Sequence, residues 1–229
     1  MQARAELDEL VLRRVADDAL RVAALLHRFD RFAQDLAVHR HALVGGAEVL
    51  AAAVGDAALA DVVMDTARRV RAANPRAIWV CDPVLGDVDT GVYVKPGIDA
   101  FFRERAIPAA DLVTPNHFEL ELLTGRRVST MAEALAAAHL LLQGPKLVLV
   151  TSLKRADHAA DQIEMLAVSR EAAWRIATPH IGFEIAPNGT GDAVAALFAA
   201  HWVQSGDVAR SLGQAASSIY AVLEKTHEM

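Results

Sequence analysis

The sequence predicts an α/β protein in which a largely parallel sheet is flanked by helices. Short continuous apolar runs, typical of strands covered on both faces, alternate along the chain with longer stretches that have a helical repeat. This alternation favours parallel strands joined by helical crossovers. Hydrophobic residues make up 53% of the 229 residues and aromatic residues only 5%, so an interior of Ala, Val and Leu is expected.

The first helix–strand unit is expected from residue 56. Residues 56–73 have the apolar spacing of an amphipathic helix, and Asn74-Pro75 would end it. Residues 77–81 follow as a short buried strand. The Gly- and Asp-rich stretch from there to Gly97 is interpreted as a loop, and Pro96 is expected to open the next helix.

The rest of the chain repeats this pattern. Asn116 with Glu119, and Thr130 with Glu133, match the capping box that begins many helices. The remaining strands are expected at residues 112–114, 147–150, 163–168 and 173–177, and further helices at residues 190–204 and 208–223. A short polar turn separates the last two strands, so they are expected to pair antiparallel.

Residues 1–44 differ from the rest, since they contain no Gly or Pro and place apolar residues at roughly helical spacing. They are expected to form one or two amphipathic helices, and no chemistry is assigned to them. The chain has no linker, repeat or low-complexity tract. The sequence therefore predicts one domain over residues 1–229, with an atypical helical segment at 1–48 and the main core at 49–229.

Composition argues against several classes of protein. A net charge of −6 leaves no basic footprint for nucleic acid. No apolar run reaches the ~18 residues that would span a bilayer, and residues 1–8 are charged, unlike a signal peptide. The single cysteine, Cys81, excludes an internal disulfide and fits a reducing compartment. A soluble cytoplasmic protein with no nucleic-acid or membrane partner is expected.

The stretch Asn188-Gly189-Thr190-Gly191-Asp192, followed by an Ala-rich helix, has the features of an anion site. Its glycines let the backbone approach a ligand, and the helix start directs unpaired N–H groups and the positive end of its dipole at one point. Asp192 would repel an anion there, unless it faces an attacking hydroxyl and removes its proton. The alternative is that Asp192 caps the helix and the glycines form an ordinary turn.

Polar residues also follow three expected strands, at the place where open α/β sheets bind ligands. They are Asp82 after the first strand, Thr114, Asn116 and Glu119 after the second, and Thr151 and Ser152 after the third. Each has a structural alternative, because Asp-Pro is a common turn and Asn with Glu forms a cap. Their occurrence together, in a chain that also has an anion site, favours one shared binding site.

Four motifs resemble those of a known family. They are Cys81-Asp-Pro-Val-Leu-Gly-Asp87 with Gly91-Val-Tyr-Val94, Thr114-Pro-Asn-His-Phe-Glu-Leu-Glu121, Val148-Leu-Val-Thr-Ser152 and Asn188-Gly-Thr-Gly-Asp192. In combination they resemble the pyridoxal kinases of the ribokinase-like superfamily, from about Gly55 to the C-terminus. The resemblance implies a three-layer α/β/α sandwich with a mostly parallel central sheet, and a homodimer. It also implies ATP-dependent phosphorylation of the 5′-hydroxymethyl group of pyridoxal, a step of vitamin B6 salvage that gives pyridoxal 5′-phosphate.

The same resemblance implies roles for individual residues. Asp192 would contact the substrate as the catalytic base, and the amides of Gly189-Thr190-Gly191 would form the anion hole. Asp82 and Glu119 would act around Mg²⁺ and ATP through water. Tyr93 lies in the segment that approaches ATP and substrate. The residues implied on the phosphate and nucleotide side are Asp82, Thr114, Asn116, Glu119, Thr151, Ser152, Thr178, Pro179, His180 and Ile181.

The family motifs that contact the pyridoxal ring are missing from this sequence. Pyridoxal kinases begin with a strand and a Ser-bearing loop that contact the pyridoxal ring, and continue with a Thr-Gln loop and a Gly-Tyr pair. Residues 1–48 match none of these, and Val49-Leu-Ala-Ala-Ala-Val-Gly55 stands where the Gly-Tyr pair is expected. The N-terminal strands are therefore expected to be missing or replaced by helices.

Two alternatives stay open. One is a hydroxymethylpyrimidine-type kinase, although that group usually carries Cys where this chain has Asp192. The other is a truncated, non-catalytic remnant of a pyridoxal kinase that binds only nucleotide.

Overall fold

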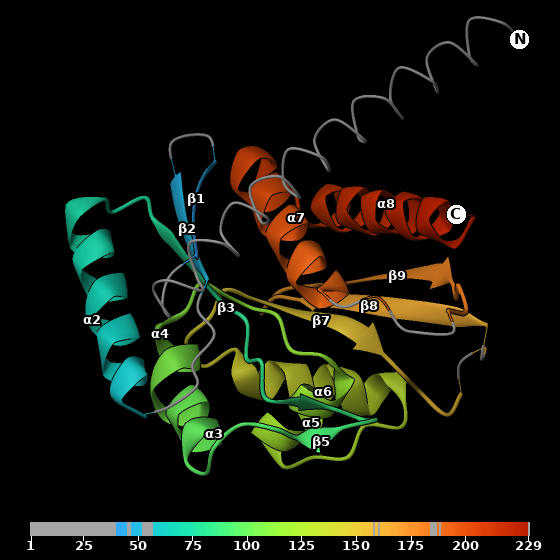
Figure 1. Ribbon diagram of the computed structural model, residues 1–229, viewed down its shortest axis with the longest axis horizontal. Coiled ribbons are helices and arrows are strands. Elements are labelled where there is room, and N and C mark those ends of the chain that lie inside the picture. Colours follow the sequence, from blue (N-terminus) through green and yellow to red (C-terminus); the bar gives the residue numbers. More distant parts are fainter. Residues whose placement is uncertain are drawn as a thin grey trace, which may run out of the picture.

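A seven-stranded sheet forms the centre of the protein (Figure 1). The computed structural model describes residues 40–44, 47–51, 57–157, 159, 161–183, 187 and 189–228. In spatial order the strands are β1 (Arg40–Val44), β2 (Ala47–Ala51), β3 (Ile78–Cys81), β6 (Leu112–Val113), β7 (Leu147–Leu153), β8 (Gln162–Val168) and β9 (Ala173–Pro179). Strands β2, β3, β6 and β7 run parallel, while β1 pairs antiparallel with β2, and β7, β8 and β9 pair antiparallel in turn. The predicted parallel core and the predicted hairpin near its end are both confirmed.

Helices cover both faces of the sheet, so the protein has three layers. One face packs against α2 (Ala57–Ala73), α3 (Ile98–Phe101), α5 (His117–Thr124) and α6 (Met131–Leu141), and the other against α7 (Thr190–Ser205) and α8 (Val208–His227). A π-helical turn, η1 (Phe102–Ala106), and α4 (Ile107–Ala109) continue α3. Figure 1 shows α7 and α8 above the sheet and α5 and α6 below it. None of the helices in the described part of the chain is long and apolar enough to cross a bilayer.

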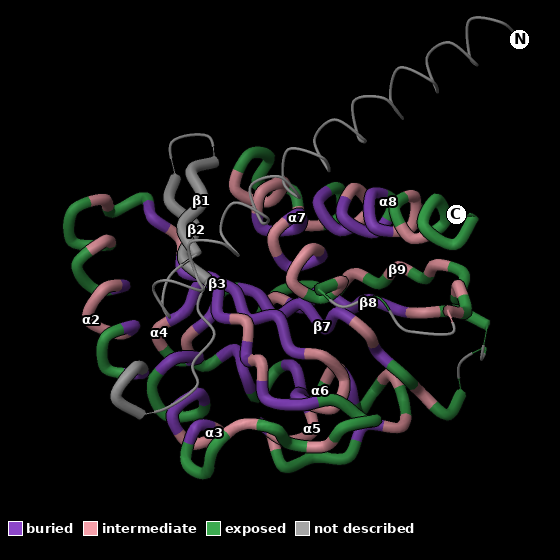
Figure 2. The backbone as a smooth tube through the Cα atoms, in the orientation of Figure 1, coloured by how far each residue is buried: buried purple, intermediate pink, exposed green. Residues whose placement is uncertain are grey.

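The central strands are buried on both faces (Figure 2). In β7, Val148 and Val150 belong to the core shared with α5 and α6, whereas Leu147 and Leu149 belong to the core shared with α7 and α8. A strand with two buried faces has a continuous apolar sequence, because neither side of it meets water. The strand predicted at residues 147–150 is therefore confirmed, and it continues to Leu153.

Most helix starts lie where the sequence places them. Both predicted capping boxes form, at Asn116 with Glu119 and at Thr130 with Glu133. The helix expected at Pro96 begins instead at Ile98, because Gly97 adopts a left-handed conformation with φ of 90° and is the N-cap. The preceding loop contains a small antiparallel hairpin, β4 (Gly86–Asp87) and β5 (Gly91–Val92), which the sequence reading treated as irregular.

The helical prediction for the N-terminal segment is wrong where the structure describes it. Residues 40–44 and 47–51 are strands, paired from Arg40 with Ala51 to Val44 with Ala47. The sequence between the two strands is Gly-Gly, a hairpin signal that the helical interpretation of this segment overlooked. The expectation that helices replace the family's strands fails here, because β2 joins the parallel core beside β3. The prediction for residues 1–39 lies outside the described residues.

Candidate active site

The carboxyl ends of β3 and β6 bring two predicted residues into contact. Asp82 directly follows β3 and Thr114 directly follows β6, and these strands are parallel neighbours. The hydroxyl of Thr114 donates a hydrogen bond of 2.8 Å to Oδ1 of Asp82. Thr114 is buried, so its hydroxyl fixes the direction of the Asp82 carboxyl at this edge of the sheet.

Asn116 and Glu119 fasten the loop after β3 to the start of α5. Oδ1 of Asn116 accepts from the Glu119 amide, and Oε2 of Glu119 accepts from the Asn116 amide, both at 2.9 Å. Oε1 of Glu119 also accepts from the Leu85 amide at 2.9 Å, and Nδ2 of Asn116 donates to the Gly86 carbonyl at 2.9 Å. The capping alternative is therefore correct in its geometry. The two side chains additionally hold the loop that carries Asp82.

The position of Gly86 explains why this loop approaches α5 so closely. A Cβ at Gly86 would lie 2.4 Å from the Gly91 carbonyl oxygen and 2.7 Å from the Phe118 ring. Sequence reasoning missed Leu85 and Gly86, because both contribute backbone groups. The only signal for them was the Gly- and Asp-rich composition of the loop.

Asp82, Glu119 and Asp192 form a cluster of carboxyl groups. Burial raises the pKa of Asp82 to about 8, against the hydrogen bond from Thr114. The charges of Glu119 and Asp192, and a hydrogen bond with Asp192, raise this pKa further. Burial also raises the pKa of Glu119 to about 7, although its backbone hydrogen bonds oppose the shift. Three acidic groups close together would stabilise a positive charge bound near them.

Asp192 lies in the first turn of α7, which begins as the sequence predicts. The N-cap is Gly189, in a left-handed conformation with φ of 82°. Asp192 is therefore not the N-cap residue of α7. The Thr190 hydroxyl donates to the Pro187 carbonyl at 2.9 Å, which holds the turn before the helix. Asn188, the first residue of the motif, lies outside the described residues.

The two glycines of this turn differ. Gly189 needs its positive φ, which side chains rarely adopt. Gly191 is within α7 and has no positive φ, and among the described residues outside α7 no atom lies within 4 Å of a Cβ built on it. Space beside Gly191 is thus open for a ligand. The amides of residues 189–191 lie in the first turn of α7, where N–H groups have no partner within the helix.

Tyr93 belongs to the same acidic surroundings. It follows β5, its amide donates to the Leu85 carbonyl at 3.1 Å, and its side chain is 57% exposed. Its pKa is raised by partial burial and then by the charges of Glu119, Asp87, Asp82 and Asp192. The exposed phenol is therefore near the carboxyl cluster, as the resemblance implies.

The remaining predicted residues lie along the same edge of the sheet. Thr151 and Ser152 are near the carboxyl end of β7, and the Thr151 amide donates to the Pro115 carbonyl at 3.1 Å. Thr178 and Pro179 end β9, which runs parallel to β7 with β8 between them. His180 and Ile181 follow, and the His180 amide donates to the Asp161 carbonyl at 2.7 Å. Residues 178–181 therefore extend the row of strand ends beyond β7.

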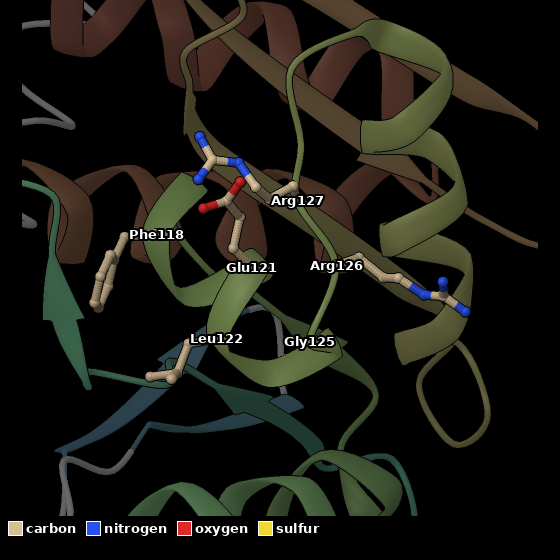
Figure 3. A pocket seen from close by; sticks show the side chains of 6 residues that line it. All are labelled: Phe118, Glu121, Leu122, Gly125, Arg126 and Arg127. Atoms are coloured by element: carbon tan, nitrogen blue, oxygen red, sulfur yellow. The ribbon is translucent and has the colours of Figure 1, made fainter.

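A surface hollow of about 280 Å³ lies elsewhere, on α5 and the loop after it. Figure 3 shows its lining residues, Phe118, Glu121, Leu122, Gly125, Arg126 and Arg127. None of them is a predicted site residue. Glu121 already accepts a hydrogen bond of 2.7 Å from the Val128 amide, which holds the loop after α5 in place. The predicted site residues therefore lie together at the strand ends and not in this hollow.

A comparison with family models decides which family this geometry belongs to. The model described as phosphomethylpyrimidine kinase matches residues 34–229. The chain belongs to the phosphomethylpyrimidine kinase family. Its sheet, covered by helices on both faces, is the ribokinase-like fold that the sequence predicted.

Individual kinases of known name are similar over the same region. The chain is 52% identical to pyridoxal kinase PdxY of Rubrobacter xylanophilus over 180 residues, which are 78% of this chain and 61% of that kinase. It is 48% identical to pyridoxal kinase PdxY of Deinococcus radiodurans, over 79% of this chain and 62% of that kinase. A pyridoxal kinase from Leishmania donovani, solved in complex with ADP, is 27% identical with a TM-score of 0.68, over 77% of this chain and 61% of the other. The chain thus spans less than two thirds of the length of these kinases.

Proposed function

We propose that this member of the kinase family provides the nucleotide half of a pyridoxal kinase. The proposed reaction transfers the γ-phosphoryl group of ATP to the 5′-hydroxyl of pyridoxal and gives pyridoxal 5′-phosphate. The observation that carries this proposal is the position of Asp192 in the first turn of α7, facing Asp82 beside a glycine turn. Similarity to kinases named for pyridoxal, one of them solved with ADP, supports the choice of substrates.

In this proposal Asp192 removes the proton of the attacking hydroxyl. The amides of residues 189–191 hold the transferred phosphoryl group, since a helix start favours negative charge. Asp82 has a pKa of about 8, so at neutral pH in the ligand-free chain it carries a proton that it can share with Asp192. Proton transfer needs a base within hydrogen-bond reach, and phosphoryl transfer depends mainly on position and charge stabilisation.

Magnesium fits this site as an ion that arrives with ATP. In the described part of the chain, no group of three or more His, Cys, Asp or Glu side chains is arranged to hold a metal ion directly. Both oxygens of Glu119 already accept backbone hydrogen bonds, so contact through water suits it better than direct ligation. A cation near Asp82 and Asp192 would reduce the electrostatic repulsion between their carboxyl groups. When bound, Mg²⁺ would supply positive charge to the phosphate oxygens.

The nucleotide is proposed to lie along the row of strand ends. Thr114, Asn116, Thr151 and Ser152 would line its phosphate side, and the segment 178–181 its adenosine side. Tyr93 would approach from the β4–β5 hairpin. This order follows the sheet from β6 across β7 to β9, where ligands of open α/β sheets are found.

The substrate side remains the open part of the proposal. The description of the matching family favours a hydroxymethylpyrimidine substrate as the alternative, while Asp192 and the names of the relatives favour pyridoxal. The third alternative is a chain that binds nucleotide without turning it over. A homodimer and a cytoplasmic location, both expected from the sequence, stay predictions.

One set of measurements tests the function. ATP consumption is followed in a coupled assay with pyridoxal, with hydroxymethylpyrimidine and with neither, beside calorimetric titration of Mg–ADP. Consumption that depends on pyridoxal supports the proposed reaction, and consumption that depends on the pyrimidine replaces it. Absence of nucleotide binding by folded protein would reject both kinases and the remnant.

A further inference from the structure

A buried ion-pair cluster lies at the carboxyl end of β7, beyond Thr151 and Ser152. Glu164, in β8, is fully buried. Arg155 binds it with two N–H groups, Nε to Oε2 at 2.7 Å and Nη2 to Oε1 at 3.1 Å. Nη1 of Arg175, in β9, also donates to Oε1, at 2.6 Å. The Arg155 side chain is 6% exposed and that of Arg175 is 52% exposed, so Arg155 is the buried partner.

The cluster adjoins an irregularity in the sheet. Val150 pairs with Leu166, and Leu153 pairs with Glu164, so Thr151 and Ser152 together lie opposite Met165 alone. This extra residue is a β-bulge in β7. Bulges bend a strand and redirect its side chains, and they are frequent beside active sites.

Packing confirms that the bulge changes which way β7 faces. In a regular strand alternate residues share a face, so Leu153 would point to the α7–α8 side with Leu147 and Leu149. Leu153 belongs instead to the core on the α5–α6 side, with Val148 and Val150. The one-residue shift therefore sets the direction of Thr151 and Ser152 relative to the rest of the sheet.

The stability of the fold does not require an ion pair at this place. Burying a carboxylate and a guanidinium costs so much solvation that apolar side chains of similar volume often serve equally well. An Arg–carboxylate pair with two parallel hydrogen bonds does, however, define a single geometry. Here it links Arg155, just after the bulge, to Glu164, which is paired with Leu153. Slippage of the bulge along β7 would break both hydrogen bonds.

We propose that Glu164 and Arg155 are positioning residues that fix the bulge at Thr151 and Ser152, and so set the affinity of the site for nucleotide. The inference rests on the proposed function for its ligand. The bulge is connected to the site through the Thr151 amide, which bonds the Pro115 carbonyl at 3.1 Å, between Thr114 and Asn116. A displaced bulge would move both the β7 residues and this connection.

The test compares Glu164→Gln and Arg155→Lys with a control at the opposite edge of the sheet, where the parallel strands begin. Each substitution keeps the approximate size of the side chain, and each removes part of the two-bond geometry. Asp111 is a matched control, because it is 5% exposed and bound by the cations of Arg71 and Lys146, both at 3.2 Å. It precedes β6, at the amino end of the parallel strands, so Asp111→Asn disturbs a buried ion pair away from the proposed site.

Three readouts are taken on each folded variant: the amide NMR shifts of Thr151 and Ser152 without ligand, the Kd for Mg–ADP, and the unfolding midpoint in urea. We expect Glu164→Gln and Arg155→Lys to shift both amides and to weaken Mg–ADP binding by about ten- to hundred-fold. Asp111→Asn should lower the urea midpoint similarly and leave the amides and the Kd unchanged. Arg155→Lys retains the buried positive charge, so this variant alone can test the positioning role if Glu164→Gln does not fold.

The outcomes separate the inference from the function on which it rests. Unmoved amides at Thr151 and Ser152 overturn the positioning role, whatever the affinity. If the amide shifts of Thr151 and Ser152 change while the Kd for Mg–ADP does not, the bulge does not set nucleotide affinity and the inference is overturned. Equal losses of affinity in Asp111→Asn reduce the effect to general destabilisation and also overturn it. Failure of the parent chain to bind Mg–ADP rejects the proposed function, and the affinity half of the inference with it.

Discussion

At the scale of single residues, the candidate site contains two buried carboxyl groups, Asp82 and Glu119, with the Asp192 carboxyl beside Asp82. Asp82 and Glu119 have raised pKa values because they are buried and because each lies near other carboxylates. Such an arrangement lowers the stability of the ligand-free fold and favours the binding of a cation at the site. The same carboxyls that make the empty site unfavourable would therefore favour a nucleotide that brings Mg²⁺.

This crowding predicts the pH dependence of stability. The folded pKa values, about 8 for Asp82 and about 7 for Glu119, lie above the ordinary values of 3.8 and 4.5. Between these limits the folded chain binds protons that the unfolded chain releases. The free energy of unfolding of ligand-free protein should therefore fall as pH rises from about 5 to 8, by up to about 1.4 kcal/mol per pH unit for each of the two groups.

Urea unfolding at several pH values across this window measures the slope. Asp82→Asn removes one of the two titrating groups, so its slope should be flatter than that of the parent. A parent chain whose stability stays level or rises with pH would show that these carboxyls are not crowded as described.

Asp192 has a second prediction at this scale. Asp192→Asn should lower phosphoryl transfer by ~10²–10⁴-fold, because the amide cannot accept the substrate proton. Mg–ATP affinity should be retained, since backbone amides hold the phosphate. Transfer from labelled ATP with enzyme in excess detects low rates. Asp207→Asn is the control, because Asp207 starts α8 as its N-cap and Asn caps equally well. A variant at Asp192 with half the parent rate would leave it no role as base.

At the scale of elements, the start of α7 tests whether the glycine turn is the phosphate site. Gly191→Val introduces a side chain where no atom of the described residues outside α7 lies within 4 Å, so the described fold has room for it and a bound phosphate would not. We expect Mg–ADP affinity to fall at least about tenfold with little change in stability, because Val has a somewhat higher helix propensity than Gly.

Gly213→Val provides the matched control for this change. Gly213 also lies within a helix, α8, and among the described residues outside that helix it also has no atom within 4 Å of a built Cβ. Its variant should likewise keep nearly the parent stability, and it should keep its nucleotide affinity in calorimetric titration. Equal affinities of the two variants would place the phosphate away from residues 189–191.

Elements with local signals could be predicted from the sequence, and those fixed by distant contacts could not. The capping boxes at Asn116 and Thr130 and the two-faced strand at residues 147–150 depend on neighbouring residues, and all three are confirmed. The bulge in β7 is defined by its pairing with β8, a separate strand, so the local sequence of β7 does not predict it. The helical interpretation of residues 1–48 is wrong at β1, because the Gly-Gly pair after this strand is a stronger local signal than the helical spacing before it.

The same distinction applies within the candidate site. Asp82, Thr114, Asn116 and Glu119 were found because parallel strands align their carboxyl ends, and the structure brings all four together. Leu85 and Pro115 were missed, because a backbone amide or carbonyl leaves no mark on residue type. The roles of the site residues in catalysis and nucleotide binding stay predictions.

At the scale of the whole molecule, the residues expected on the nucleotide side share one edge of the sheet. The row from Asp82 to Thr178 lies along this edge, and α7 contributes its N-terminus to it. The motifs expected to contact the pyridoxal ring have no match among residues 1–55.

This asymmetry leads to the last prediction, that the chain binds Mg–ATP but phosphorylates pyridoxal far below the ~1–100 s⁻¹ typical of kinases. A hydroxyl that is not held in line loses much of the rate that orientation supplies, and water entering an open site weakens the charge stabilisation. β1 lies at one edge of the described sheet, and an edge strand that no other segment covers favours self-association or marginal stability. Turnover, light scattering and calorimetric titration test these points, with the Rubrobacter xylanophilus kinase assayed in parallel. A monodisperse chain that matches the turnover of that kinase would show that its own residues complete the pyridoxal pocket.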